Sequence, residues 1–223
     1  MQSSSIDITM KDKTKFLLKK QNEKTFYFQN ISNLEEEKID YIWSRDPALI
    51  KQYTKVVDEN YEDELLLKDV YKKISKTDFV SYYRLIVCRN KNKIVGGFRM
   101  VSNNPAIETS LPSEREEFTY AGLFPELDLL NNRSCELSRF AIAKEYRANK
   151  DYYVDAFTSS KQKMTENNIK YLFLCGSKAM LRSHKREAGK LFKYIDTRNH
   201  DVSGWEDFKH LEFYVSAYEN PDV

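Results

Sequence analysis

The sequence predicts one mixed α/β domain, and three observations lead to that expectation. The chain has 223 residues with 41% hydrophobic and 13% aromatic content, so one domain can bury roughly 70% of the surface that the unfolded chain exposes. Apolar runs at 83–88 and 93–100 flank a short polar segment, which is typical of an antiparallel hairpin. From residue 136 onward, strand-like and helix-like segments alternate.

The first part of the chain is polar and precedes this domain. Residues 1–24 carry many Ser, Lys and Asp, so we expect a polar arm there, or a helix around residues 16–18, ahead of a domain at 25–223. The domain should open with a strand and two helices. The strand is expected at 25–29, one helix from an Asn33 cap through Trp43, and the other from Pro47 through Val57.

The second half should alternate strands and helices. Ser177 suits the N-cap of one helix, and Gly189 suits the residue that ends it. Leu211, Phe213 and Val215 alternate with polar neighbours, which indicates a closing antiparallel strand. The other expected elements are strands at 136–143 and 171–175 and helices at 153–167 and 178–188.

Composition argues against several classes of protein. The 36 Lys and Arg nearly balance the 34 Asp and Glu, so the net charge of +2 gives no global field for nucleic acid. The apolar stretches are strand-sized, and residues 1–11 lack the apolar core of a signal peptide. We therefore expect a cytoplasmic protein without a membrane span.

Metal and nucleotide motifs are missing from the sequence. Its six glycines form neither of the glycine-rich phosphate-binding signatures, and no serine-nucleophile elbow occurs. The odd number of cysteines, each within or beside an apolar run, indicates reduced core thiols, and the scattered histidines lack metal-ligand spacing, so no metal is expected. These residues are Cys88, Cys135, Cys175, His184, His200 and His210.

Residues 135–142 place an acid, a hydroxyl and a guanidinium inside an apparent buried strand. An unpaired buried carboxylate costs on the order of several kcal/mol, so Glu136 is either ion-paired, with Arg139 as its candidate partner, or kept for chemistry on a substrate amine. In a regular strand these two side chains point to opposite faces. One β-bulge would bring them onto one face, and bulges are common beside active sites.

The string Glu-Leu-Ser-Arg-Phe-Ala-Ile at 136–142 resembles the signature strand of the acyl-homoserine-lactone synthases and N-acyl amino acid synthases, within the GNAT acyltransferase superfamily. Residues 94–100 resemble their strand ending in Gly-x-x-Arg-Leu, and residues 124–127 their Phe-Pro-Glu element. Residues 177–189 resemble their Ser-x-Ala-Met helix ending in Arg-x-x-Gly. The resemblance implies a single GNAT-like domain with a central mixed, largely antiparallel sheet flanked by helices.

The same resemblance implies a function. The protein would move a fatty acyl group from an acyl-carrier-protein or acyl-CoA thioester to the amine of a small carboxylate-bearing acceptor, either an amino acid or S-adenosylmethionine. The product would be an N-acyl amino acid or a quorum signal of the acyl-homoserine-lactone type. Glu136 would be the catalytic base. The acceptor would be bound by Asp78, Arg99, Ser138 and Arg139, and the thioester by Phe140, Ala141, Ile142, Arg147, Gly176, Ser177 and Met180.

The donor site departs from the acetyl-CoA pattern. Lys150 and Tyr152 stand where relatives that use acetyl-CoA carry glycines, which obstructs close backbone approach to a pyrophosphate, and Asp151 adds negative charge. This favours an acyl carrier protein, which is acidic, as partner. A basic face for it could comprise Arg147, Lys150, Lys178, Arg182, Lys185 and Arg186, although the last four are equally explained as the solvated side of a helix.

The acceptor site also departs from the family. Residues 53–61 lack the Arg-x-x-x-Phe and Trp elements that shape the S-adenosylmethionine pocket, which slightly favours a free amino acid. Arg99 is equally explained as a structural partner of Glu136 or Asp78. Two other functions stay open. One is an acetyl-CoA-dependent N-acetyltransferase for a protein or small amine, and the other is a non-catalytic GNAT-like binding module.

Overall fold

The structure is a computed structural model of the chain. It divides the chain into two compact units, residues 1–38 and residues 39–223. The larger unit begins at Ile39 and not at residue 25, where the domain was expected to begin. The residues described are 16–21, 25–30, 38–65, 81–103, 110–114, 118–147, 151–188, 192–196 and 214–223.

The smaller unit contains an antiparallel hairpin of β1 (Phe16–Gln21) and β2 (Thr25–Asn30). The strand expected at 25–29 is confirmed. The helix considered around residues 16–18 is wrong, because this segment pairs along its whole length with β2. The Thr, Phe and Tyr residues of β2 favour strand over helix, so the partner strand decides the conformation of both segments.

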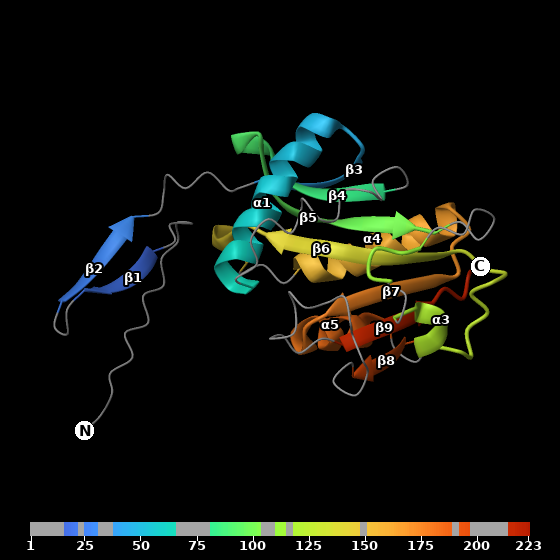
Figure 1. The fold of residues 1–223 in the computed structure, drawn as a ribbon. Coiled ribbons are helices and arrows are strands. Elements are labelled where there is room, and N and C mark those ends of the chain that lie inside the picture. Colours follow the sequence, from blue (N-terminus) through green and yellow to red (C-terminus); the bar gives the residue numbers. More distant parts are fainter. Residues whose placement is uncertain are drawn as a thin grey trace, which may run out of the picture. The chain divides into compact units, whose positions relative to one another are not determined.

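The larger unit is built on a seven-stranded sheet in the order β3-β4-β5-β6-β7-β9-β8 (Figure 1). Among the described strands, β6 and β7 form the parallel pair and the other neighbours are antiparallel. The fold class predicted from the sequence is therefore confirmed. The strands are β3 (Ile39–Ser44), β4 (Ser81–Cys88), β5 (Lys93–Ser102), β6 (Ser134–Ile142), β7 (Tyr171–Gly176), β8 (Phe192–Asp196) and β9 (Tyr214–Glu219).

Two predictions at the edges of this sheet were incomplete. β3 lies where the sequence predicts a helix, because its β-branched and aromatic residues pair in register with β4, from Ile39 opposite Cys88 to Ser44 opposite Tyr83. β8 was not predicted. The closing antiparallel strand is confirmed as β9, but it lies between β7 and β8 and is buried from Tyr214 to Tyr218 rather than on one face only.

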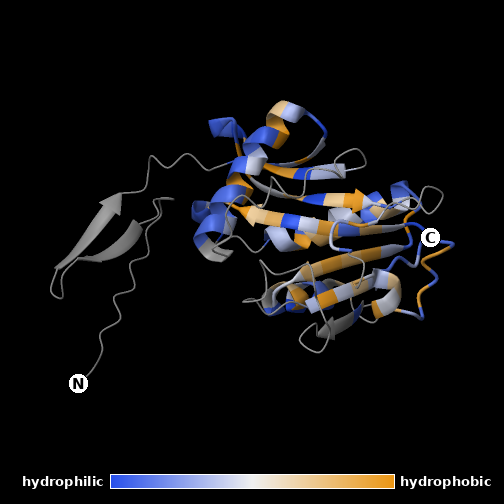
Figure 2. Ribbon diagram, viewed as in Figure 1, coloured by the Kyte–Doolittle hydropathy of each residue, from blue (hydrophilic) through white to orange (hydrophobic). Residues whose placement is uncertain are grey.

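Helices cover both faces of the sheet (Figure 1). One face carries α1 (Pro47–Leu65) and the short α3 (Tyr120–Leu123), and the other carries α4 (Asp151–Glu166) and α5 (Lys178–Ala188). Apolar colouring concentrates along β5 to β7, whereas much of α1 is hydrophilic (Figure 2). Within the described segments, no helix combines the length and the apolarity that crossing a bilayer requires.

The predicted helix boundaries follow ordinary capping chemistry. Pro47 occupies the first position of α1, where its missing N–H is not needed, and the Asp46 carboxylate accepts the backbone N–H of Ala48 over 2.8 Å. The helix α5 begins and ends at the predicted residues, and the hydroxyl of Ser177 lies 3.5 Å from the backbone N of Met180 as its cap.

Candidate active site

Strand β6 carries a β-bulge at Arg139. Gly97 of β5 lies opposite Ala141, but the next pair is Arg99 opposite Ser138, so two residues of β6 face one residue of β5. Arg139 adopts a left-handed conformation with a φ of 58°. A bulge is therefore present, but it lies at Arg139 and Phe140 and not between Glu136 and Arg139, where the sequence analysis considered one. The hydroxyl of Tyr53 in α1 donates to the Arg139 carbonyl and so fixes this unfavourable backbone conformation.

Gly97 allows the neighbouring strands to pass close to the bulge. Its φ is 153°, and a methyl group there would collide with the carbonyl oxygen of Arg84 in β4. Only glycine adopts this conformation without strain. The glycine of the Gly-x-x-Arg pattern is therefore required by the strand geometry directly opposite the bulge.

The pairing of the two central strands, β6 and β7, ends just before the bulge. β6 and β7 pair from Ser134 opposite Tyr171 to Leu137 opposite Leu174, and their register ends there. β6 continues beside β5, and β7 continues beside β9. The β7-facing backbone groups of β6 after Leu137 are consequently not used by β7. They line a fork in which backbone N–H groups can polarise a carbonyl oxygen.

Glu136 lies beside this fork, and the residue is only 1% exposed. One carboxylate oxygen accepts the backbone N–H of Ser113 over 2.8 Å and the hydroxyl of Tyr120 over 2.9 Å. The other accepts the Ser113 hydroxyl over 2.8 Å. Glu136 thus takes its hydrogen bonds from Ser113 and Tyr120, and not from Arg139, which was the candidate partner in one of the two alternatives considered from the sequence.

The pKa of Glu136 is raised above its ordinary value because burial disfavours the charged form. The hydrogen bonds from Ser113 and Tyr120 and the charge of Arg99 act in the opposite direction. A carboxylate whose pKa is raised is a stronger base than that of an exposed glutamate.

Two of the predicted acceptor residues share the face of Glu136. Arg99 is buried and donates through Nε to the Ser138 hydroxyl over 3.1 Å. These two residues are cross-strand partners, and Val101 is the partner of Glu136, so side-chain alternation places all three groups on one face. Arg139 is buried at the bulge. Asp78 lies outside the described residues.

The hydrogen-bond network extends to a thiol on β7. The Tyr120 hydroxyl lies 3.4 Å from Cys175 Sγ, and its ring stacks on Phe173 with a centroid distance of 4.0 Å. Burial raises the pKa of Tyr120 well above its ordinary value and that of Cys175 to about 12. Both groups therefore keep their protons at neutral pH. The cysteines predicted as reduced thiols are free, and Cys175 is the one that is not fully buried.

Sequence reasoning missed Ser113, Tyr120 and Tyr53. Ser113 and Tyr120 belong to a loop that contacts Glu136 from 23 and 16 residues away, and no periodicity links them to the strand. Tyr53 lies on a predicted helix, but its contact with the bulge spans 86 residues. Only the clustering of polar residues between two buried strands could have drawn attention to the loop.

The predicted thioester residues divide between the core and the fork. Phe140 stacks on Tyr153 of α4 with a centroid distance of 4.8 Å, and Ala141 and Ile142 are buried. Arg147 donates to the carbonyl of Ile142 over 2.9 Å and to the side chain of Asn60 in α1 over 2.8 Å. Its guanidinium therefore ties the strand end to α1 within the protein itself.

Gly176, one of the residues expected to bind the thioester, has little open space beside it for an acyl tail. A methyl group there would lie 3.1 Å from Met180 Sδ and 3.3 Å from Leu174 Cδ2. The side chains of these two residues already fill the volume beside the glycine. A long acyl tail in this position requires Met180 to move.

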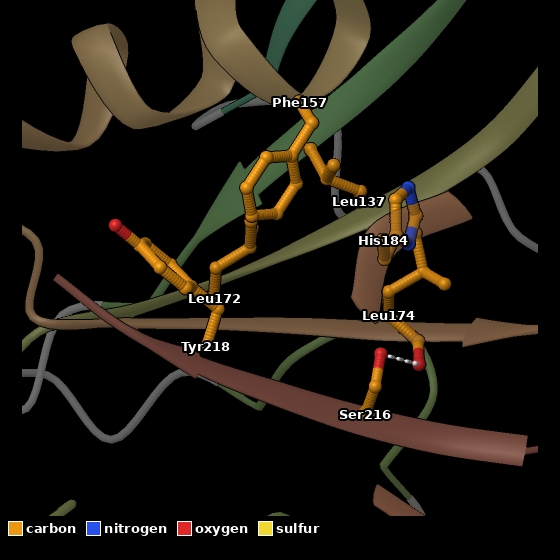
Figure 3. A pocket seen from close by; sticks show the side chains of 7 residues that line it. All are labelled: Leu137, Phe157, Leu172, Leu174, His184, Ser216 and Tyr218. Atoms are coloured by element: carbon orange, nitrogen blue, oxygen red, sulfur yellow. Dashed lines mark hydrogen bonds between the residues drawn. The ribbon is translucent and has the colours of Figure 1, made fainter. Parts of the chain in front are cut away.

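A small cavity lies behind the fork, on the face covered by α4 and α5 (Figure 3). Its volume of about 10 Å³ accommodates one water-sized group. Apolar side chains, including Leu137 and Phe157, line it together with His184 and Ser216. The His184 ring stacks on Phe157 at 5.6 Å, and burial lowers its pKa to about 4. His184 is therefore neutral at physiological pH.

A larger pocket, of about 370 Å³, lies beside α1. Its lining includes Tyr83 of β4, the cross-strand partner of Arg99, so it opens on the Glu136 face of the sheet. The other lining residues are Arg45, Pro47, Ile50, Lys51, Thr54 and Ser81. No cluster of His, Cys, Asp and Glu suited to a metal ion occurs in the part of the chain that the structure describes.

A family model described as an acetyltransferase (GNAT) domain matches residues 61–154. The chain contains a GNAT domain. A search of the curated proteins gave no match. The GNAT fold serves N-acyltransferases that use an acyl-CoA or acetyl-CoA thioester, and the bulge described above lies within the matched residues.

Solved structures resemble this GNAT domain at low sequence identity. FeeM, an N-acyl amino acid synthase from uncultured soil microbes, is 11% identical with a TM-score of 0.58, covering 84% of this chain and 93% of its own. The AHL synthase LasI is 15% identical with a TM-score of 0.52, covering 82% and 91%. NAA60 from Arabidopsis thaliana, solved with a bisubstrate analogue, is 10% identical with a TM-score of 0.54, covering 82% and 99%. These likenesses show the fold alone.

Proposed function

We propose that the protein transfers a fatty acyl group from a carrier-bound thioester to the amine of a small carboxylate-bearing acceptor, giving an N-acyl amino acid. The observation that carries this proposal is the placement of Glu136, a buried carboxyl group with a raised pKa, beside an open fork of the central sheet. FeeM, whose title names it an N-acyl amino acid synthase, has the same fold.

The reaction is direct attack of a neutral amine on the thioester. A bond forms between the amine nitrogen and the carbonyl carbon, and the carbon–sulfur bond breaks as the thiolate leaves. The amine gives its proton to Glu136, and the thiolate takes one from solvent. A positioned base of suitable pKa contributes roughly 10² to 10⁴ in rate. Backbone N–H groups of β6 at the fork would hold the carbonyl oxygen.

The acceptor would bind on the α1 face of the sheet. The pocket of about 370 Å³ has the size of ordinary small-molecule sites. Arg45 and Lys51 line it, and Arg99 lies on the same face beside its floor. These three cations favour an acceptor that carries a carboxylate. Arg99 and Arg139 would orient that carboxylate through bidentate hydrogen bonds.

The donor would be an acyl carrier protein. Tyr152 is buried in the first turn of α4, where close approach of a pyrophosphate needs a bare backbone, and Asp151 places negative charge there. Arg147 is occupied within the protein. A carrier protein presents only its phosphopantetheine arm, so it does not need a pyrophosphate site at the start of α4. The cations of α5 that could meet its acidic surface are exposed, namely Lys178, Arg182, Lys185 and Arg186.

The experiment tests each candidate donor with each candidate acceptor. The purified protein is incubated with either an acyl carrier protein loaded with a fatty acyl group or the matching acyl-CoA, and with either mixed amino acids or S-adenosylmethionine. Mass spectrometry identifies the product. We expect N-acyl amino acids from the carrier-bound donor. Release of methylthioadenosine would show that S-adenosylmethionine is the acceptor and a lactone signal is the product. A preference for acyl-CoA would show that the carrier protein is not the donor.

A second candidate is an acetyl-CoA-dependent N-acetyltransferase. The observation that favours it is the filled space beside Gly176, because Met180 and Leu174 leave little room for a long acyl tail. Turnover with acetyl-CoA but not with longer thioesters would select this candidate. Absence of turnover with every donor would indicate that the protein is a non-catalytic binding module.

A further inference from the structure

We propose that Ser113 relays the proton of the acceptor amine to Glu136, and that Tyr120 and Glu114 are positioning residues for this relay. The proposal rests on the proposed function in one respect, the assignment of Glu136 as base. It adds a catalytic residue from a loop that carries none of the residues predicted from the sequence.

Accessibility is the first reason. Within the network around Glu136, the residues Glu136 and Tyr120 are each 1% exposed, whereas Ser113 is 9% exposed. The hydrogen bonds to the carboxylate come from Ser113 and Tyr120. A substrate amine therefore meets the Ser113 hydroxyl more readily than the carboxylate itself.

The geometry of Ser113 suits proton transfer in both directions. Its hydroxyl donates to one Glu136 oxygen over 2.8 Å, and a hydroxyl oxygen also has lone pairs that can accept an amine N–H. The amine proton moves to Ser113 Oγ as the hydroxyl proton moves to Glu136. Serine is unchanged overall, and Glu136 gains the proton. Meanwhile the Ser113 backbone N–H holds the other carboxylate oxygen at 2.8 Å.

Tyr120 is a poorer relay and a better positioning group. Burial raises its pKa well above the ordinary value, so it keeps its proton and acts as a fixed donor to Glu136. Its ring is held by stacking on Phe173. Cys175, the partly exposed group at the other end of the network, has a pKa of about 12 and also keeps its proton.

Glu114 joins the two halves of the loop. One of its carboxylate oxygens accepts the backbone N–H of Leu111 over 2.7 Å, and the other accepts that of Tyr120 over 3.0 Å. This bridge fixes the spacing between Ser113 and Tyr120, and so aims both of their hydroxyls at Glu136. Glu114 contacts neither the fork nor the α1 pocket through these bonds, so it acts through its neighbours.

The test compares Ser113→Thr with Ser113→Val. These two variants have nearly the same shape and both keep the backbone N–H, but only Thr keeps the hydroxyl. We expect kcat of the Val variant to fall about 10²-fold, the scale of a lost acid–base group, while Thr retains most activity and the KM of the acceptor stays the same in both. Ser160→Ala, which removes a buried hydroxyl bonded to Ala156 in α4, is the matched control and should leave kcat unchanged.

The positioning role of Tyr120 has its own readout. The hydrogen bond from Tyr120 lowers the pKa of Glu136, so Tyr120→Phe should move the acidic limb of the pH profile of kcat/KM to higher pH. A purely structural role would lower the whole profile without moving the limb. An unmoved limb would overturn the positioning role.

The outcomes separate this proposal from the function on which it rests. If Glu136→Gln loses activity but Ser113→Val matches Ser113→Thr, the relay is wrong and the base assignment stands. If Glu136→Gln retains full activity, the base assignment is wrong and the relay falls with it. Equal loss in the Thr and Val variants, with folding intact by circular dichroism, would assign the loss to loop shape and overturn the relay.

Discussion

The hydroxyl of Tyr120 donates to the carboxylate of Glu136 over 2.9 Å, joining a short loop helix to the middle of the central sheet. This contact, with the bonds from the neighbouring loop, satisfies a carboxylate that would otherwise be an uncompensated group in the core. The acid is consequently buried, oriented and still able to change its protonation state.

The variant Glu136→Gln should fold and lose about 10²-fold or more in the chemical step. The amide can place its oxygen toward Tyr120 and the backbone N–H of Ser113, and its NH₂ toward the rotatable Ser113 hydroxyl, so each neighbour keeps a partner. Single-turnover kinetics with a saturating donor measure the step. Unchanged turnover would rule out Glu136 as the base.

Gly97→Ala should destabilise the fold by about 2 kcal/mol or more. The new methyl group meets the backbone of Arg84, and the φ of 153° is strained for any residue with a side chain. Urea unfolding measures the effect. Gly122→Ala is the control, because a methyl group there meets only the Thr119 hydroxyl at 3.2 Å, and it should change the unfolding free energy by about 0.5 kcal/mol or less. Equal effects at the two glycines would contradict the close approach at the bulge.

Tyr53→Phe should weaken the bulge. The hydroxyl of Tyr53 donates to the Arg139 carbonyl, and losing a typical buried hydrogen bond costs about 1 to 3 kcal/mol. We expect a lower midpoint of thermal unfolding and a reduced kcat/KM, because the β6 backbone at the fork is no longer fixed. Ser160→Ala is again the comparison for stability. A variant with reduced stability but normal kcat/KM would separate the bulge from the chemistry.

Charge reversal on α5 tests the carrier-protein donor. Lys178 and Arg182 are exposed and lie four residues apart, so they share a helix face. Replacing both with Glu should raise the KM for the carrier-bound donor about tenfold or more, and the effect should shrink with added salt. The KM for an acyl-pantetheine donor without the carrier should not change. Lys55→Glu, at an exposed position on α1, is the control. An equal effect on both donors would exclude docking as the cause.

The sequence predicts the motif strand well because its information is local. Arg99 and Ser138 come together through strand alternation and register, and the bulge follows from the need to place polar groups in a buried strand. Side-chain volume beside Gly176 could not be predicted, because Met180 reaches it from another element. Partial apolar periodicity through Trp43 suggested a helix, whereas pairing with β4 makes a strand. Short apolar segments take their conformation from their partners.

The donors to Glu136 could not be predicted for a related reason. Ser113 and Tyr120 lie in a loop whose shape depends on the Glu114 carboxylate, and such contacts leave no period in the sequence. The need for a partner was clear from the burial of Glu136, but the candidate considered, Arg139, does not supply the hydrogen bonds to its carboxylate. Long-range polar contacts are specified by the assembled fold.

His184 should make the fold sensitive to acid. Burial lowers its pKa from 6.5 to about 4, so between these values the unfolded chain binds a proton that the folded protein does not. The free energy of unfolding therefore falls as the pH drops through this window, by roughly 3 kcal/mol when the window is crossed. Glu136, whose pKa is raised, contributes in the opposite direction. Comparing two proteins that share Glu136 removes its contribution.

The comparison is His184→Phe against the unchanged protein, by urea unfolding at pH 7 and pH 4.5. Phe keeps the ring that stacks on Phe157 and removes the titrating group. We expect the unchanged protein to lose about 2 to 3 kcal/mol more stability between the two pH values than the variant does. An equal loss in both would mean that His184 is protonated in the folded state, and that the cavity behind the fork admits enough water to solvate the charge.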